Sequence, residues 1–152
     1  MSALIRTQTV SFDQEVDSAS LPEHLALCLR SVDADTVGVT GNRVTFTGGM
    51  FRLVWNWNVL KPFGSGDLTV DSDTCEVRYT LNFQQLVLVA TAMTGVMAAF
   101  VLALSGLREA LGVAFALPLM WFFVVFGNLA VGFARFQSFV SRAIATAPRI
   151  HS

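Results

Sequence analysis

Two long runs without a charged side chain dominate the C-terminal half of this sequence. No Asp, Glu, Lys or Arg occurs in residues 79–107 or in residues 110–134, and only Arg108 and Glu109 separate the two runs. Each run is longer than the ~20 apolar residues that cross the hydrocarbon core of a bilayer. The sequence therefore predicts an integral membrane protein with a transmembrane helical hairpin.

The two membrane helices are expected over residues 86–107 and 111–133. At a rise of 1.5 Å per residue, the first helix, of about 22 residues, spans roughly 33 Å, which is enough to cross. Pro118 lies inside the second helix, where a proline removes a hydrogen bond and usually introduces a kink. The pattern favours a kinked full span over the alternative, in which the crossing begins at Pro118.

The charges divide the chain into an acidic N-terminal part and a basic C-terminal part. Residues 1–82 carry six basic and ten acidic side chains and thus a net charge of −4, whereas residues 83–152 have four arginines and one glutamate, a net charge of +3. An acidic N-terminal head argues against a nucleic-acid partner, because nucleic-acid phosphates require clustered Lys and Arg.

Residues 1–83 are expected to form an α+β head on the cytoplasmic side. Alternating polar and apolar residues predict about six short strands in one antiparallel sheet. These strands are expected at residues 7–12, 36–40, 43–47, 51–59, 68–71 and 75–83. The Gly41-Asn42 pair predicts a tight hairpin between two of them, and residues 71–74 predict another turn. No linker is expected between the last strand and the first membrane helix.

One helix is expected in the head, over residues 21–31. Ser20 with Glu23 three positions later is a capping-box pattern, and Pro22 suits the first turn of a helix. The leucines at positions 21, 25 and 29 fall on one helical face. They are expected to cover the apolar face of the sheet in an α+β arrangement.

Residues 135–152 are expected to form an amphipathic cytoplasmic tail after the hairpin of residues 84–134. Its apolar face would lie along the lipid headgroups or against the head. Arg78, Arg135 and Arg142 flank the head and tail sides of the spans, so the positive-inside rule places both termini in the cytoplasm. The first ten residues show no secretory signal, which also favours a bacterial inner-membrane protein with a cytoplasmic head.

Small residues form a possible packing seam on each membrane helix, because they allow backbones to approach closely. The candidate contacts are Gly95, Ala99 and Ala103 on the first helix and Gly127, Asn128 and Gly132 on the second. The seams pack the hairpin against itself or face another protein. For the Asn128 amide, a hydrogen bond within the hairpin, to Ser105, Thr94 or Thr91, is favoured over a bond to a partner.

Aromatic residues supply two further candidate surfaces. Trp121, next to three phenylalanines at positions 122, 123 and 126, would face lipid or a partner, or anchor the helix at the membrane interface. In the head, the alternation of residues 51–59 predicts that two tryptophans fill the core while Asn56 and Asn58 face outward. Asn56 and Asn58 are therefore the candidate contact surface of the head.

Catalytic and cofactor chemistry is not expected. Neither span contains an ionisable side chain, which argues against a proton or ion pathway. His24, Cys28 and Cys75 are too few and too widely spaced for a zinc site, and thiols in the cytoplasm stay reduced. The acidic residues at positions 71, 73 and 76 lack the glycine and the later glutamate of a calcium loop.

The sequence favours a non-catalytic accessory or scaffolding subunit of a larger bacterial membrane complex in transport, respiration or photosynthesis. Its expected partners are the lipid bilayer and the other subunits of that complex, without nucleic acid or a cofactor. The alternative is a self-assembling membrane-anchored sensor whose head binds a small ligand.

Overall fold

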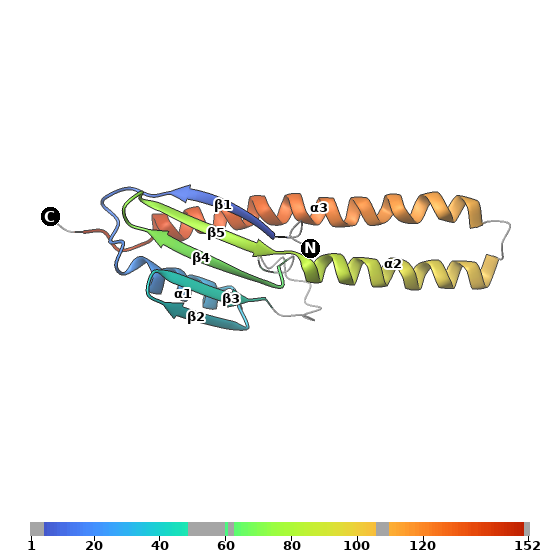
Figure 1. Ribbon diagram of the computed structural model, residues 1–152, viewed down its shortest axis with the longest axis horizontal. Helices are drawn as coiled ribbons and strands as arrows, with labels where there is room; N and C mark the ends of the chain where they lie inside the picture. The colour runs from blue at the N-terminus through green and yellow to red at the C-terminus, as the bar shows by residue number, and fades with distance from the viewer. Residues whose placement is uncertain (1–4, 49–59, 61–62, 106–109, 151–152) are drawn as a thin grey trace.

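A computed structural model describes residues 5–48, 60, 63–105 and 110–150 of the chain. Within these residues the chain is α+β, with a five-stranded antiparallel sheet and three helices. The strands are β1 (Ile5–Ser11), β2 (Thr36–Thr40), β3 (Arg43–Thr47), β4 (Ser65–Asp71) and β5 (Glu76–Asn82), and the helices are α1 (Leu21–Ser31), α2 (Gln84–Ser105) and α3 (Ala110–Ala145). Figure 1 shows the sheet and α1 at one end, with α2 and α3 extending side by side from it.

The order of the strands in the sheet is β1-β5-β4-β3-β2. The predicted hairpin at Gly41-Asn42 is formed, because β2 pairs with β3 from Thr40 opposite Arg43 onward. Its Gly41 adopts a φ of 59°, which glycine tolerates well. Five of the predicted strands correspond to β1–β5, and the sixth, at residues 51–59, lies outside the described residues.

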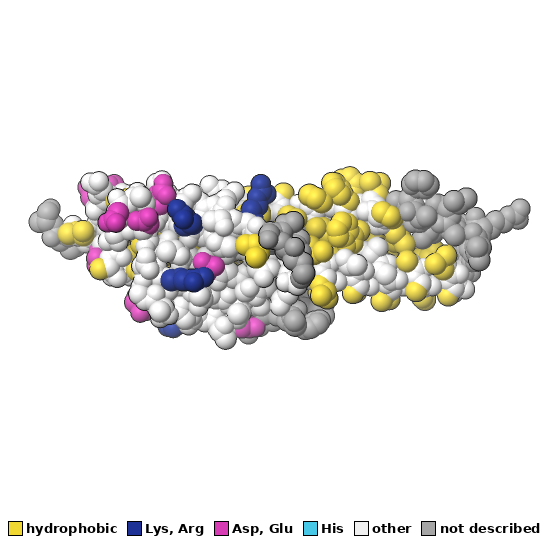
Figure 2. All heavy atoms as spheres, in the orientation of Figure 1, with side chains coloured by type: hydrophobic (Ala, Val, Ile, Leu, Met, Phe, Trp, Pro, Cys, Tyr) yellow, Lys and Arg dark blue, Asp and Glu magenta, His cyan; other side chains and the backbone are white. Residues whose placement is uncertain are grey.

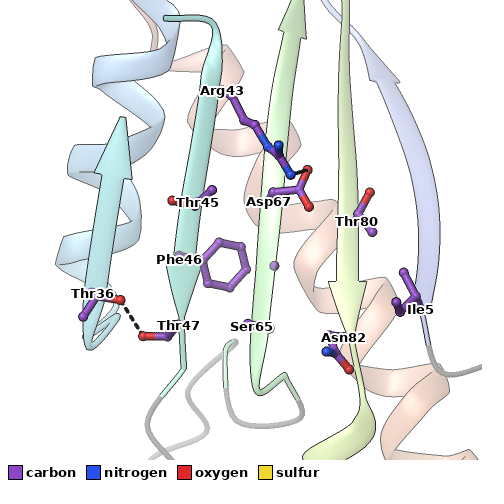
Figure 3. Close-up of a pocket in the computed structure, with 11 residues that line it drawn as sticks. Ile5, Thr36, Arg43, Thr45, Phe46, Thr47, Ser65, Asp67, Thr80 and Asn82 are labelled. Atoms are coloured by element: carbon purple, nitrogen blue, oxygen red, sulfur yellow. Dashed lines mark hydrogen bonds and ion pairs between the residues drawn. The ribbon is translucent and has the colours of Figure 1, made fainter. Parts of the chain in front are cut away.

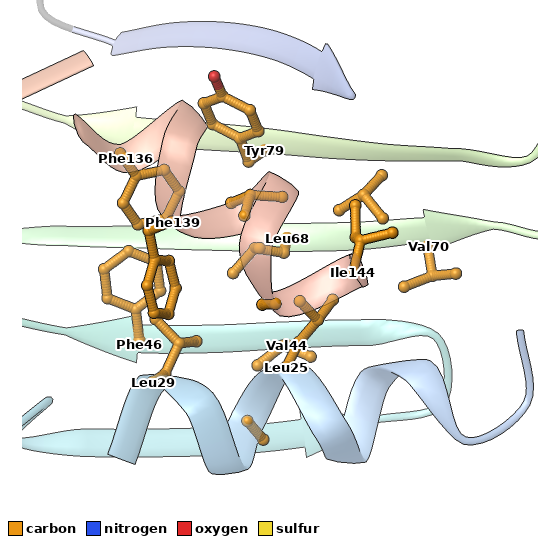
Figure 4. Close-up of a cluster of buried hydrophobic side chains, with 14 of the residues drawn as sticks. Leu25, Leu29, Val44, Phe46, Leu68, Val70, Tyr79, Phe136, Phe139 and Ile144 are labelled. Atoms are coloured by element: carbon orange, nitrogen blue, oxygen red, sulfur yellow. The ribbon is translucent and has the colours of Figure 1, made fainter. Parts of the chain in front are cut away.

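The sheet has one covered and one open face, as the alternation predicts. Buried apolar side chains of β3, β4 and β5 lie on the covered face: Val44, Phe46, Leu68, Val70, Val77, Tyr79 and Leu81. α1 packs over this face with three buried leucines, at positions 21, 25 and 29. Figure 4 shows α1 and the C-terminal end of α3 sharing this face of the sheet.

The predicted α1 is formed, but the expected capping box is not. The Ser20 side chain makes no capping hydrogen bond, and its hydroxyl instead donates to the Asp17 carbonyl oxygen at 3.2 Å. The reason is local: Ser20 already has helical dihedral angles, and the Leu21 amide bonds the Asp17 carbonyl oxygen at 3.1 Å. The helical hydrogen bonding therefore starts one turn before the position that the capping pattern indicates.

The C-terminal end of α3 lies against the head, which is one of the two positions expected for the tail. Apolar residues of this end of α3, and Ala147 just after it, are buried in the same core as the sheet; those of α3 are Phe133, Phe136, Phe139, Val140, Ala143 and Ile144. Below, "the head" means residues 5–83 together with residues 133–150. "The apolar hairpin" means α2 together with residues 110–132 of α3.

Phe136 lies at the centre of the head core and is fully buried. Its ring centroid is 5.2 Å from that of Tyr79, 5.4 Å from Phe63, 5.7 Å from Phe46 and 5.8 Å from Phe139. Offset and edge-to-face aromatic contacts in this range each add to the free energy gained from burial. A residue of the long C-terminal helix therefore joins three parts of the head.

The end of the chain also pairs with the loop before α1. The Asp17 amide bonds the Pro148 carbonyl oxygen at 3.0 Å, and the Ile150 amide bonds the Glu15 carbonyl oxygen at 2.8 Å. The Arg149 and Glu15 side chains form an ion pair at 3.4 Å. This pair is exposed and contributes little by itself, but the backbone bonds hold the C-terminal segment on the head.

Two connections join the head to the apolar hairpin. Only Phe83 separates β5 from α2, and the Gln84 amide bonds the Asn82 side-chain oxygen at 2.9 Å. The other connection is α3 itself, which runs without interruption from the hairpin into the head and includes Pro118. Because neither connection contains a linker, the orientation of the head follows that of the helices.

Two of the helices are long and apolar enough to cross a membrane, as judged by length and composition. The stretches concerned are Gln84–Ala103 and Ala116–Ala145, and few of the residues in the most apolar 18-residue part of each are buried inside the structure. Figure 2 shows charged side chains over the head and hydrophobic side chains over the hairpin on the face in view.

Candidate functional site

The outer surface of the apolar hairpin carries most of the small residues of the predicted seams. A Cβ atom added at Gly95 or at Gly127 would meet nothing within 4 Å, so open space lies next to both. Ala99 and Ala103 are also exposed. The open space beside Gly95 and Gly127, and the exposed surface of Ala99 and Ala103, are available to a second molecule.

The seam predicted on α3 does not form one continuous surface. Gly132 is buried, whereas Gly127 and Asn128 are exposed. In a helix of 3.6 residues per turn, two residues five positions apart point in directions that differ by about 140°. Gly127 and Gly132 therefore lie on different sides of α3. Asn128 and Gly132 differ by only about 40° in direction, but Asn128 is exposed and Gly132 is buried.

Asn128 makes a different hydrogen bond from the one expected. Its Nδ2 donates to the Val124 carbonyl oxygen of the same helix at 2.7 Å. Thr91 and Thr94 instead donate to carbonyl oxygens of α2 at 2.7 and 2.8 Å. Because the exposed Asn128 amide has a second N–H and a carbonyl oxygen, it retains hydrogen-bonding capacity for a neighbouring molecule.

A side-chain hydrogen bond that links the two helices comes from Trp121. Its indole Nε1 donates to the Thr91 hydroxyl oxygen at 3.0 Å, and that hydroxyl donates to the Val87 carbonyl oxygen. Of the aromatic row, Trp121 is therefore held partly within the hairpin. The neighbouring Phe122 and Phe126 are exposed, and their rings stack with centroids 4.2 Å apart.

Removing this interhelical bond is expected to weaken the hairpin modestly. Trp121→Phe and Thr91→Val should each lower the unfolding free energy by about 0.6 kcal/mol, because hydrogen bonds between helices in apolar surroundings are of this size. The measurement is unfolding of the full chain in mixed micelles. Thr94→Val is the matched control, since its hydroxyl bonds only its own helix. Because both substitutions remove the same bond, the double variant should lose less stability than the sum of the two single losses. A loss equal to that sum would contradict the bond.

A polar hollow of about 340 Å³ lies on the open face of the sheet. Its lining residues come from all five strands, and Figure 3 shows Ser65 and Asp67 of β4 near its middle. An ion pair at 3.5 Å joins Arg43 to the half-buried Asp67. The other lining residues are Ile5, Thr36, Thr45, Phe46, Thr47, Gly66 and Thr80. Its hydroxyl, amide and carboxylate groups suit a small polar ligand better than an apolar one.

This hollow is not evident from the sequence. The signal for it is weak, because polar residues alternate with apolar ones in any antiparallel strand that faces water on one side. Only the strand order places residues from β1 and β2, at opposite edges of the sheet, around the same hollow. Asn56 and Asn58, the predicted surface of the head, lie outside the described residues.

His24 and Cys28 lie next to each other, as the helical spacing predicts, but they serve a structural contact. The His24 Nε2 lies 3.1 Å from the Ala143 carbonyl oxygen and 3.2 Å from the Thr146 hydroxyl oxygen, so it ties α1 to the end of α3. Cys28 Sγ is 3.6 Å from the same nitrogen. The described residues contain no cluster of three or more possible metal ligands that includes them.

Residues 71–74, which include Asp71 and Asp73, form the predicted turn. The Asp71 carboxylate accepts hydrogen bonds from the backbone amides of Asp73 and Thr74, at 3.1 and 3.3 Å. These bonds, that from Thr74 foremost, hold the pKa of Asp71 below its ordinary value. The carboxylate is thus occupied in holding the turn.

Stability is expected to fall at alkaline pH. Burial raises the pKa values of the Cys28 thiol and the Tyr79 phenol above their ordinary values. The unfolded chain therefore releases these protons at lower pH than the folded chain, and the free energy of unfolding decreases as pH rises above about 9. The check is denaturant unfolding at increasing pH for wild type and Cys28→Ala, with Cys75→Ala as control. An unchanged slope in Cys28→Ala would contradict the contribution of Cys28.

Comparisons with protein-family models, curated proteins and solved structures found no match to this chain. The functional proposal therefore depends on the surfaces described above.

Proposed function

We propose that this protein is a non-catalytic accessory subunit of a larger bacterial membrane complex, and that α2 and α3 cross the inner membrane. The main support for this proposal is the open space beside Gly95 and Gly127 on the outer surface of the hairpin. Glycine costs about 1 kcal/mol relative to alanine within a helix. Contact with lipid chains does not offset this cost, whereas the packing energy of a closely approaching helix does.

The exposed Asn128 supports the same proposal. A side-chain amide in contact with lipid chains lacks partners for its remaining donor and acceptor, and such groups commonly form hydrogen bonds between helices. Asn128 keeps this capacity after bonding Val124. A neighbouring helix with a polar side chain at this depth would satisfy it.

The rigid connection of head and hairpin supports a scaffolding role. A head joined through β5 and through the continuous α3 has a restricted orientation at the membrane surface. The arginines near the ends of the spans favour a cytoplasmic location for the head and both termini. A head held in one orientation presents a defined surface to a neighbouring subunit.

The test is co-purification of tagged full-length chain from its native membrane in mild detergent. Wild type is expected to retain a stoichiometric set of larger membrane proteins. Gly95→Leu and Gly127→Leu should reduce the retained amount about tenfold, because the added side chains block close approach. Val96→Phe is the control, since it adds bulk at another exposed position of α2. Recovery of the wild-type chain alone as a monomer would contradict the accessory role.

A second candidate function is a self-assembling membrane sensor, and the polar hollow on the sheet favours it. Its volume of about 340 Å³ is at the lower end of small-molecule sites. A thermal-shift screen of the full chain in detergent tests this function. Stabilisation by one polar metabolite that disappears in Asp67→Asn would favour the sensor, and absence of any such ligand would leave the accessory role in place.

A further inference from the structure

We propose that Arg6, supported by the ring of Phe133, binds the phosphate group of a membrane lipid where the head meets the hairpin. This inference rests on the membrane location proposed above, but it does not depend on the accessory role. It assigns a ligand class to a basic residue that lies far from both seams in the sequence.

The position of Arg6 follows from the register of β1. Arg6 pairs with Leu81 of β5, whose side chain is buried on the helix-covered face. On this side its guanidinium carbon lies over the Phe133 ring, 5.3 Å from the centroid. Cation–π contacts at this distance orient a guanidinium against an aromatic face. The Arg6 charge is therefore held on α3 rather than extended freely into water.

The height of Arg6 relative to the proposed membrane is set by two phenylalanines. Phe133 packs on Phe83 with ring centroids 4.8 Å apart, and Phe83 is the residue directly before α2. Phe133 itself lies next to the end of the uncharged run at residue 134. Arg6 therefore lies at the end of both spans that is nearest the head. In the proposed membrane this is the depth of the lipid phosphates.

The protein offers Arg6 no counter-ion within its described part. The ion pairs in that part do not include Arg6. β1 and α3 contain no Asp or Glu, and the one acidic residue of β5, Glu76, pairs with Ser11 at the opposite end of β1. A guanidinium stays charged and presents a planar fork of N–H donors that matches phosphate oxygens. A cation–π contact uses no conventional hydrogen-bond acceptor, so the N–H donors of Arg6 stay available for an anion.

The surroundings favour a lipid phosphate over a soluble one. Leu88 and Val89, in the second turn of α2, are 64% and 43% exposed. Exposed apolar side chains at the start of a span with a cation just outside it are typical of a membrane interface, where the apolar part enters the lipid and the charge stays at the headgroups.

The test is native mass spectrometry of the full chain in mild detergent, titrated with phosphatidylglycerol. A diacyl glycolipid with the same acyl chains and no phosphate is the second probe. Arg6→Gln is expected to bind phosphatidylglycerol about tenfold more weakly, as loss of a charge-assisted hydrogen-bond pair implies. Arg78→Gln is the matched control, because Arg78 lies on the neighbouring strand, opposite Thr9 and away from the hairpin. The glycolipid should not distinguish these variants.

A second variant separates lipid binding from folding. Phe133→Leu keeps an apolar side chain but removes the ring under Arg6, so it should also weaken phosphatidylglycerol binding while the chain stays folded by circular dichroism. Equal binding by wild type and Arg6→Gln would overturn the proposal. Displacement of the lipid by millimolar glycerol phosphate would overturn it too, because the site would then bind soluble phosphate esters.

Discussion

Deletion of residues 135–152 is expected to unfold the head while leaving intact the two uncharged runs, residues 79–107 and 110–134. The deletion removes Phe136 and Val140, which are fully buried, together with the backbone bonds to Asp17 and Glu15. Without them the sheet exposes Phe46 and its apolar neighbours to water. An unsupported sheet of this size cannot bury enough apolar surface to offset its conformational entropy. Limited proteolysis and circular dichroism of the shortened chain measure the effect.

A complementary variant keeps the tail and removes the hairpin. The rings of Phe83 and Phe133 are 4.8 Å apart, so about six Gly and Ser residues suffice to join residue 84 to residue 133. This variant is expected to fold cooperatively in water without detergent. A chain of residues 1–84 alone that unfolds cooperatively and resists protease would contradict the requirement for the tail.

Phe136→Ala is expected to lower the unfolding free energy of the head by about 3–5 kcal/mol, the usual cost of removing a buried aromatic ring. The cost should lie high in this range because the Phe136 ring contacts those of Phe46, Phe63 and Tyr79. Domains of this size have total stabilities of about 5–15 kcal/mol, so the head would be only marginally stable. Denaturant unfolding of the hairpin-free variant gives the value directly.

The matched control for Phe136→Ala is Phe122→Ala in the same helix. Phe122 is 47% exposed on the hairpin surface, so in the full chain its truncation should change the stability of the head by less than about 0.5 kcal/mol. Comparable losses in the two variants would show that the α3 rings contribute through helix formation and not through packing in the head.

The local elements of this fold could be predicted because each depends on neighbours a few residues apart. Period-two alternation locates strands such as residues 36–40 and 43–47, and the leucines of residues 21–31 locate α1. The capping box at Ser20 was wrong, since the pattern does not reveal that Asp17 already begins the helical turn. The limit was therefore the detailed backbone geometry at the start of the helix, not the existence of the helix.

The candidate site could be predicted only in part, because direction around a helix is decided by packing. The small residues were recognisable, yet Gly127 faces outward and Gly132 is buried. The hydrogen bond between the helices uses Trp121 and Thr91 instead of Asn128. The phosphate site proposed at Arg6 depends on Phe133, which is 127 positions away in the sequence.

The sequence by itself determined the two uncharged stretches, the alternation of the strands and the amphipathic character of the tail, since these are properties of nearby residues. Only the tertiary structure decided that β1 pairs with β5 and that the apolar face of the tail packs on the sheet. The physical reason is that an apolar face gains similar free energy against lipid or against protein. Complementary packing around Phe136 selects the head, and this choice involves residues more than fifty positions apart.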